Sequence, residues 1–516
     1  MSPKISDTNA LGLLIRLAIV ALFGIGIIAY TTNAFASVPH SSLLIIAAVI
    51  GGYMALNIGA NDVANNVGPA VGSLALSMGA AIVIAAIFEA GGAIIAGGDV
   101  VSTIKKGIID PSNLSDPMTF IWVMMAALLA GAIWLNLATA VGAPVSTTHS
   151  IVGGVLGAGI AAGGMEIANW NKMGAIAASW VISPVLGGLI AAGFLFIIKR
   201  LIIHQDDMIT AAKRILPFLL AIMSWAFITY LCLKGVKKIW AIDFQTAMLL
   251  GFFGAIATVF LSRQLIAKAA EKLNNDRHDV SNLFTLPLIF SAALLSFAHG
   301  ANDVANAIGP LAAINDAIIN VGISEKAAIP LWVMLIGAIG IAIGLALFGP
   351  KLIRTVGTEI TDLDKPRAFC IALAAAITVI IASQLGLPVS STHIAVGGIF
   401  GVGFLREYLK RTYLAEMHAV SSQLTGKDKI RVEHILNNHT KVTVEEINKV
   451  FRRLKQGRKQ LDMNKKEIKR LKKGYKEELV KRSALYKIVA AWIITVPASA
   501  ALAALLFFTL RGMLGS

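Results

Sequence analysis

The sequence predicts an all-α, polytopic membrane protein built from two inverted-topology repeats with broken or re-entrant helices. Hydrophobic residues make up 56% of the 516 residues and charged residues only 14%, whereas soluble domains carry about 25% charged residues. Long apolar runs with helical spacing recur along the chain, and three sequence blocks occur twice in the same order. The runs predict roughly 10–12 transmembrane helices, because about 20 apolar residues can cross a bilayer as a helix.

The first run, residues 10–31, also resembles a signal peptide, because Lys4 precedes it and an Ala-Phe-Ala tripeptide ends at Ala36. We expect a retained helix, since the apolar stretch is longer than an ordinary signal-peptide core. Cleavage of residues 1–36 stays open. Two shorter stretches, residues 151–163 and 394–405, fit re-entrant or half-length helices. The other runs that can span are residues 42–58, 79–97, 117–141, 174–198, 215–233, 246–262, 284–298, 327–348, 368–385 and 488–510.

The most informative feature is the motif Gly-Ala-Asn-Asp-Val-Ala-Asn, which occurs letter for letter at residues 59–65 and 300–306. A second block, Gly-x-Pro-Val-Ser-x-Thr-His, occurs at residues 142–149 and 386–393. A third block begins at Trp180 in one half and at Trp492 in the other. Polar, Gly-rich breaks at matching positions of two hydrophobic halves indicate the central site of a secondary transporter.

The repeat and the distribution of charge divide the chain into six segments. Basic residues near 199–214 and 263–277 predict cytoplasmic loops, because Lys and Arg concentrate on the inner side of membranes. Repeat one then ends, and repeat two begins, on the cytoplasmic side, whereas helix 10–31 with a cytoplasmic N-terminus brings the start of repeat one to the outer side. The two repeats therefore face opposite ways in a plasma or inner membrane. The expected segments are 1–41, an extra transmembrane helix with a cytoplasmic N-terminus; 42–198, repeat one; 199–283, basic linkers with two extra transmembrane helices; 284–404, repeat two; 405–487, a basic cytoplasmic helical insertion; and 488–516, the last transmembrane helix of repeat two.

The basic insertion, residues 405–487, holds 23 Lys and Arg residues against 10 Asp and Glu residues. Its second part, residues 442–486, contains few helix breakers and is expected to be helical. No nucleic-acid-binding motif and few aromatic residues accompany these charges, so we expect contact with the lipid bilayer and no nucleic acid. Cys232 and Cys370 lie in apolar runs and are expected to be buried thiols rather than a disulfide.

Each Pro-Val-Ser block predicts the beginning of a half-helix, because proline and hydroxyl side chains favour helix starts. The free N–H groups and the dipole at such a start attract an anion without help from Lys or Arg. We therefore expect these hydroxyls to bind an oxyanion; the alternative is that they only satisfy backbone groups or join helices. The candidate residues are Ser146, Thr147, Thr148, Ser390, Ser391 and Thr392.

The duplicated Asn-Asp motifs offer carboxylate and amide oxygens, which are the ligands that hard cations such as sodium prefer. Carboxylates repel an oxyanion unless a cation lies between them, and the motifs contain no Lys or Arg. A site for an oxyanion together with a cation follows; the alternative, helix caps without a ligand, would leave costly buried charges. The candidate cation ligands are Asp62, Asn65, Asp303 and Asn306.

Three further ionisable residues lie in apolar surroundings. His149 and His393 occupy matching positions and are candidates for proton coupling, although a packing role is the stronger interpretation. Glu89 lies in the run 79–97 without a recognisable counterpart in repeat two, and a carboxylate at membrane depth is a candidate for coupling.

The motifs disfavour other classes of protein. An enzyme is not expected, because no nucleophile–base pair and no metal-ligand cluster is recognisable. No ATPase signature occurs, so transport would use ion gradients, and paired Asp motifs argue against a passive anion channel. No cofactor is expected beyond co-transported sodium ions or protons.

Through these blocks, the chain resembles the inorganic phosphate transporter (PiT) family. The resemblance rests on the motifs at residues 59–65 and 300–306, on the Pro-x-Ser-x-Thr-His elements and on the stretch 87–110. It covers most of residues 42–404 and resumes at 486–510.

The resemblance implies symport of inorganic phosphate with sodium or protons. Carried over, Asn61 and Asn302 join the hydroxyl clusters as phosphate ligands, and Asp62 and Asp303 are ligands of sodium and phosphate. Some bacterial members of the family have His in place of the Asn before the Asp, and this variant is associated with proton-coupled uptake of metal phosphate. This chain has Asn in both motifs, which favours sodium over proton-coupled uptake of phosphate or metal phosphate. Another oxyanion such as sulfate stays open, as does the oligomeric state, including a homo-oligomer.

Overall fold

The computed structural model describes residues 10–514 apart from residues 115, 144, 237–239, 320–328, 359–362 and most of 422–481. In that last stretch it describes residues 424, 426–438, 442, 446, 447 and 450. The described residues form helices and connecting turns, with one isolated bridge between Ile109 and Ala168. Residues 442–486, expected to be helical, lie mostly outside the described residues, and helix α20 covers their last five.

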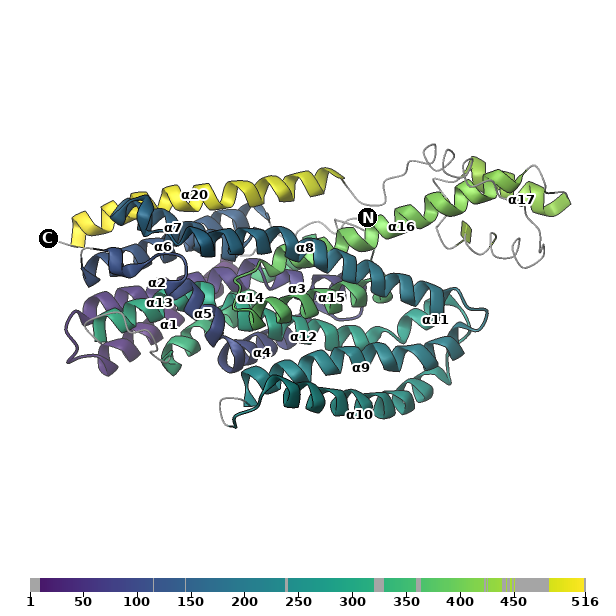
Figure 1. The fold of residues 1–516 in the computed structure, drawn as a ribbon, viewed down its shortest axis with the longest axis horizontal. Helices are drawn as coiled ribbons and strands as arrows, with labels where there is room; N and C mark the ends of the chain where they lie inside the picture. The colour runs from purple at the N-terminus through teal and green to yellow at the C-terminus, as the bar shows by residue number, and fades with distance from the viewer. Residues whose placement is uncertain are drawn as a thin grey trace.

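Eleven helical segments of the described residues are long and apolar enough to cross a membrane, within the predicted 10–12. They run roughly along one direction and form an elongated bundle (Figure 1). The α-helices are α1 (Ala10–Ala34), α2 (Ser41–Asn61), α3 (Ala64–Gly72), α4 (Met78–Ala96), α5 (Gly98–Lys106), α6 (Pro117–Val141), α7 (Thr147–Gly163), α8 (Trp170–Ile198), α9 (Met208–Lys234), α10 (Phe244–Ala270), α11 (Arg277–Asn282), α12 (Thr285–Asp303), α13 (Ala305–Ile319), α14 (Leu331–Thr358), α15 (Lys365–Gln384), α16 (Ser391–Val420), α17 (Gly426–Asn437) and α20 (Arg482–Leu514).

The two Asn-Asp motifs form short breaks between consecutive helices rather than long loops. Helix α2 ends at Asn61 with Asp62 as its C-cap, and α3 begins two residues later at Ala64. In the second half only Val304 separates α12 from α13. The motif glycines and alanines remain helical, because both breaks are buried and the backbone groups must find partners within the chain.

The Ser-Thr blocks begin helices, as expected, but the two helices differ in length. Helix α7 has 17 residues and is short. Helix α16 has 30 residues and continues past residue 405 to Val420, so the expectation of a half-length helix at 394–405 is wrong. Its second half carries charged residues such as Arg406, Glu407 and Lys410, and a count of apolar residues therefore stopped too early. Pro388 precedes the N-cap residue Ser390 instead of starting the helix.

The two halves of the chain are interleaved. Helix α2 packs on α14, and α4 packs on α12, where α12 and α14 are the repeat-two counterparts of α2 and α4. Likewise α7 packs on α20 and α8 on α16. Exchanging each helix for its counterpart reproduces this set of contacts. The counterparts α8 and α20 also end at opposite ends of the bundle, as inverted repeats require (Figure 1).

The basic segments that flank the extra helix pair lie at one end of the bundle. Helix α8 ends, α9 begins, α10 ends and α11 begins at this end, and α16 leaves the bundle there toward α17 (Figure 1). The C-terminus lies at the opposite end. The pair α9 and α10 forms one edge of the bundle, and α1 packs on α2 with most of its surface exposed.

In the pairs α2–α14 and α4–α12, four glycines allow the helices to touch backbone to backbone. A Cβ atom at Gly344 would lie 1.9 Å from the carbonyl oxygen of Leu56, and one at Gly92 would lie 1.9 Å from that of Phe297. Gly59 and Gly300 make the corresponding contacts from the other side of each pair. Small residues at helix contacts are the usual means of close packing within membranes.

Replacing Gly344 by Ala should therefore lower the thermal stability of the purified protein markedly. Overpacking of this kind costs about 1–3 kcal/mol. The matched control is Gly193→Ala on an exposed face of α8, near its C-terminal end, where nothing lies within 4 Å of the added Cβ. The control should be neutral or slightly stabilising, because Ala favours helix over Gly by about 1 kcal/mol. Equal melting temperatures of the two variants in detergent would contradict the close contact.

Candidate functional site

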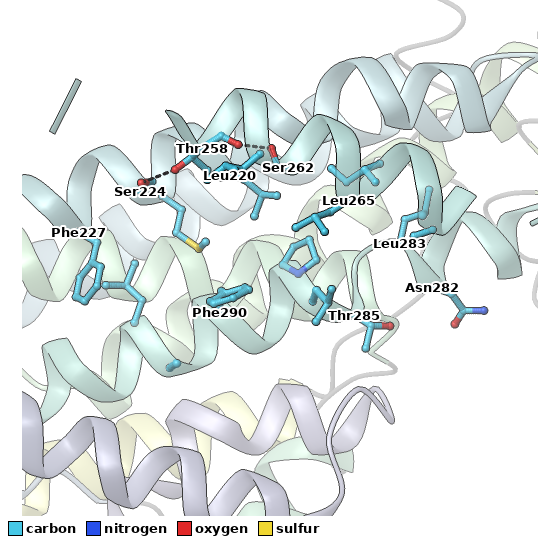
Figure 2. A pocket seen from close by; sticks show the side chains of 18 of the residues that line it. Leu220, Ser224, Phe227, Thr258, Ser262, Leu265, Asn282, Leu283, Thr285 and Phe290 are labelled. Atoms are coloured by element: carbon cyan, nitrogen blue, oxygen red, sulfur yellow. Dashed lines mark hydrogen bonds between the residues drawn. The ribbon is translucent and has the colours of Figure 1, made fainter. Parts of the chain in front are cut away.

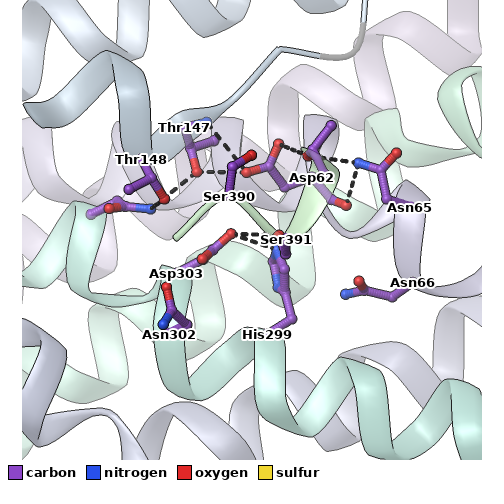
Figure 3. A network of polar contacts seen from close by, with 12 residues as sticks. Asp62, Asn65, Asn66, Thr147, Thr148, His299, Asn302, Asp303, Ser390 and Ser391 are labelled. Carbon is purple, nitrogen blue, oxygen red and sulfur yellow. Dashed lines mark hydrogen bonds and ion pairs between the residues drawn. The ribbon is translucent and has the colours of Figure 1, made fainter. Parts of the chain in front are cut away.

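Four helix ends meet near the middle of the bundle. The C-terminal ends of α2 and α12 bring Asp62 and Asp303, and the N-terminal ends of α7 and α16 bring the two hydroxyl blocks (Figure 3). All of these side chains are buried. The repeat brings segments more than 300 residues apart into one polar cluster, which we call the central cluster.

Asp62 accepts hydrogen bonds from both hydroxyl blocks. The hydroxyl of Thr147 donates to Oδ2 at 2.5 Å, and the hydroxyl of Thr392 donates to Oδ1 at 3.1 Å. Thr147 lies in the same repeat as Asp62, and Thr392 lies in the other. This carboxylate therefore joins the starts of both hydroxyl helices.

Asp303 lies in a different environment. It accepts a hydrogen bond from the Ser391 hydroxyl at 2.9 Å, and Nε2 of His299 lies 2.9 Å from the same oxygen, Oδ2. The other ring nitrogen of His299, Nδ1, lies 2.7 Å from Oε2 of Glu89. Asn66 donates to the second oxygen of Glu89 at 2.7 Å. A chain of buried polar groups thus runs from Asn66 to Asp303.

Glu89 was a candidate from the sequence, whereas His299 and Asn66 were missed. His299 stands four residues before Asp303, which places both side chains on one face of α12. That spacing, together with a histidine inside an apolar run, was a usable signal. The contact with Glu89 joins residues 210 positions apart and has no local signature.

The motif asparagines reach across to the hydroxyl block of the opposite repeat. Asn65 donates to the Thr392 hydroxyl at 2.9 Å, and Asn306 donates to the hydroxyls of Thr147 and Thr148, both at 3.1 Å. Ser146 and Ser390 act as N-caps, accepting hydrogen bonds from the backbone N–H groups of His149 and His393. The amide nitrogens are thus used within the protein.

Several oxygens of the cluster, by contrast, remain without a hydrogen-bond partner among the described residues. All are buried acceptors, and leaving a buried acceptor unpaired costs about 1–3 kcal/mol. They are Oδ1 of Asn65, Asn66, Asn302, Asn306 and Asp303. Carboxylate and amide oxygens accept but cannot donate, so a cation suits them and an anion does not.

One cation could be shared by side chains from both halves. Single ligand atoms of Asp62, His299 and Asp303 all lie within 4.8 Å of one another. Within the part of the chain that the structure describes, neither Lys nor Arg makes a hydrogen bond or ion pair with Asp62 or Asp303. A bound cation, or His299 when it is protonated, would supply positive charge next to these carboxylates.

Asn61 and Asn302 lie at the edge of the cluster and brace the loops that lead to the hydroxyl blocks. Asn61 donates to the Thr139 hydroxyl at 2.9 Å and accepts from the backbone N–H of Val145 at 3.2 Å. Asn302 donates to the Ser383 hydroxyl at 2.9 Å and keeps Oδ1 unpaired. Both the amide nitrogen and the amide oxygen of Asn61 thus have partners within the protein, whereas only the amide nitrogen of Asn302 does.

The paired histidines lie behind the hydroxyl blocks. The rings of His149 and His393 meet edge to face with centroids 4.4 Å apart. Trp180 covers His149 at 3.9 Å, and Trp492 stacks on His393 at 3.6 Å. Neither imidazole makes a hydrogen bond or ion pair with Asp62 or Asp303, and the surroundings of both rings are aromatic.

The two halves of the cluster differ at several positions, among them Asn66, whose counterpart is Ala307, and Thr147, whose counterpart is Ser391. Gly59 contacts the backbone of Ile341, and its counterpart Gly300 contacts the backbone of Glu89, so Ile341 is the counterpart of Glu89. Ile58 and His299 each directly precede one copy of the motif and are therefore counterparts as well. One helix pair therefore carries Glu89 and His299, and the other carries two isoleucines. The chain of polar groups from Asn66 through Glu89 to His299 therefore has no counterpart in the other half, where Ala307, Ile341 and Ile58 stand.

Eleven apolar helices, two interleaved repeats and a buried polar site between them define a multi-pass membrane transporter. Residues 58–503 match the model of the phosphate transporter family. The chain belongs to this family, as the resemblance of its motifs predicted, and it is a transporter rather than an enzyme.

The relatives match between 70% and 96% of this chain. A Helicobacter pylori (strain J99) protein named "Putative phosphate permease" is 53% identical, over 96% of this chain and 95% of its own. A Pyrococcus abyssi protein also named a putative phosphate permease is 39% identical over 70% of this chain and 89% of its own. A solved structure described as the sodium-dependent phosphate transporter superimposes with a TM-score of 0.75 and 32% identity, covering 92% of this chain and all of that one.

Proposed function

We propose that this phosphate transporter is a symporter that imports inorganic phosphate together with sodium ions. The observation that carries the proposal is the set of unpaired buried oxygens next to two helix N-termini. The oxygens suit a hard cation, and the helix starts suit an oxyanion. A site that favours both ions only together couples their transport.

The residues divide into two groups by what they can offer. Asp62, Asp303, Asn65 and Asn306 supply oxygens for sodium. The hydroxyl and N–H groups of Ser146, Thr147, Thr148, Ser390, Ser391 and Thr392 donate to phosphate once their present acceptors, mainly the two carboxylates, bind cations instead. We place Asn302 with the sodium ligands through its unpaired Oδ1, and we assign Asn61 to bracing the loop before α7.

The membrane orientation is part of the proposal. The basic ends of α8 and α10, the start of α9 and helix α17 lie at one end of the bundle, which we assign to the cytoplasm. In this proposal the chain divides into an extra helix (1–41), repeat one (42–198), an extra helix pair with basic linkers (199–283), repeat two (284–404), a cytoplasmic insertion (405–487) and the last helix of repeat two (488–516). The membrane is the plasma or inner membrane of the cell.

The coupling ratio follows from electrostatics. Moving one charge through 100 mV is worth about 2.3 kcal/mol, so importing divalent phosphate against a negative interior costs about 4.6 kcal/mol. Two sodium ions cancel this electrical term, and a third ion, or monovalent phosphate, makes the membrane potential a driving force. Two Asp motifs offer at least two cation sites, and we propose two or more sodium ions per phosphate.

Uptake of labelled phosphate into proteoliposomes should therefore rise with sodium concentration with a Hill coefficient above one. The reason is that more than one sodium ion must bind before phosphate crosses. A potassium gradient of equal size is the control and should drive no uptake. A hyperbolic sodium dependence, or full uptake driven by a pH gradient without sodium, would replace this proposal with proton symport.

The identity of the anion is tested in the same vesicles. The cluster offers neutral donors and cations, which suit any tetrahedral oxyanion, so labelled sulfate is a second arm of the experiment. Unlabelled phosphate should compete with labelled phosphate, and an equal concentration of sulfate should not. Efficient sodium-driven sulfate uptake would assign the site to oxyanions in general.

A further inference from the structure

An apolar groove lies between the extra helix pair and repeat two, away from the central cluster. Its walls come from α9 and α10 and its floor comes from α12, with a volume of about 430 Å³ (Figure 2). Leu220, Met223 and Phe227 line it on one side and Leu265 on the other, above Phe290. Leu265 and Phe290 are also exposed, so the groove opens sideways onto the apolar surface that faces the bilayer.

The few hydroxyls in the walls are already used. The Thr258 hydroxyl donates to Ser224 at 2.8 Å, and the Ser262 hydroxyl donates to the Thr258 carbonyl oxygen at 2.5 Å (Figure 2). These groups offer little to a polar solute. The body of a molecule in this groove is therefore a hydrocarbon chain.

One end of the groove is polar and positively charged. Asn282 and Thr285 line this end, at the start of α12, and the ammonium group of Lys365 donates to Oδ1 of Asn282 at 2.7 Å. Among the described residues, no carboxylate lies within 4.0 Å of the Lys365 ammonium group. The neighbouring carboxylate, that of Asp364, pairs with Arg277 instead. The N-cap of α12, Phe284, carries no capping side chain, so the first N–H groups of the helix add to the positive potential.

We propose that this groove binds one anionic phospholipid, with an acyl chain along α12 and the phosphate beside Lys365. Hydrocarbon and anionic ends match the two ends of the groove, and basic pockets between transmembrane helices are a known way to hold such headgroups. The lipid fills the space between the extra helix pair and repeat two. It thereby ties α9 and α10 to the transport core.

Native mass spectrometry of the full chain in mild detergent tests the proposal. The probes are dioleoyl phosphatidylglycerol, dioleoyl phosphatidylcholine and inorganic phosphate alone. We expect the wild-type protein to retain phosphatidylglycerol about tenfold more strongly than phosphatidylcholine. Lys365→Gln should remove this preference. The matched change Lys172→Gln, in the first turn of α8 and away from the groove, should keep it.

Filling the groove tests the acyl-chain part separately. Ala293→Phe on the floor and Ala269→Trp on the more exposed wall should each abolish retention of both lipids. Because Ala269 is exposed, its variant should fold even if the Ala293 variant does not. Undiminished phosphatidylglycerol retention in the folded Ala269 variant would overturn the proposal. A lipid-free dimer in the spectrum would also overturn it and assign the groove to a second copy of the chain.

Discussion

Replacing Asp303 or Asp62 by Asn should abolish sodium-driven phosphate uptake while leaving membrane insertion intact. Both carboxylates are buried, and each lies at the junction of a motif helix with a hydroxyl block. Asn preserves the size of the side chain and one acceptor oxygen but removes the negative charge that balances a bound cation. Interactions of charged groups are worth about 1.5–3 kcal/mol, which corresponds to about 10–150-fold weaker cation binding at each site.

The measurement is initial uptake into proteoliposomes, with protein in the membrane quantified in parallel. The matched control is Asp207→Asn, an exposed N-cap residue of α9 that accepts a hydrogen bond from the Thr210 N–H. Asn caps helices as well as Asp does, so this control loses one charge at no structural cost. Near-normal uptake by either site variant would remove that aspartate from the coupling site.

Features that depend on residues close together in the sequence could be predicted from it. The apolar runs predicted the spanning helices, since each depends only on its own composition. The hydroxyl blocks predicted the starts of α7 and α16, because N-capping involves residues three positions apart. The shared motifs also predicted that Asp62 and Asp303 would meet, because inverted repeats bring matching breaks together at a central site.

The parts that depend on distant or unmatched residues could not be predicted. Glu89 had no recognisable partner because its contact, His299, lies in the other repeat and the counterpart positions are isoleucines. The length of α16 was missed because its outer half is stabilised outside the apolar core, where hydropathy carries no signal. The buried ion pair between Lys105 and Asp316, at 2.6 Å, likewise joins segments 211 residues apart.

The interaction of Glu89 with His299 leads to the second large effect. His299→Ile alone leaves Glu89 and Asp303 buried without their shared partner, and removing one member of a buried charged pair costs about 3–5 kcal/mol. Glu89→Ile alone leaves His299 with only Asp303. Each single variant should therefore lose most of its thermal stability in detergent, with a lower yield of folded protein.

The triple variant Glu89→Ile with His299→Ile and Asn66→Ala separates structure from coupling. It copies Ile341, Ile58 and Ala307, which the other repeat already packs at the corresponding positions, so thermal stability should return to near the wild-type level. Sodium-driven phosphate uptake should nevertheless stay at least about tenfold reduced, because Asp303 has lost the charged group that sets its interaction with a cation. Asp62, which lies near Ile58, retains its own hydroxyl partners in this variant. Recovery of both stability and uptake would assign Glu89 and His299 to packing alone, and failure to recover stability would contradict the proposed equivalence of the two helix pairs.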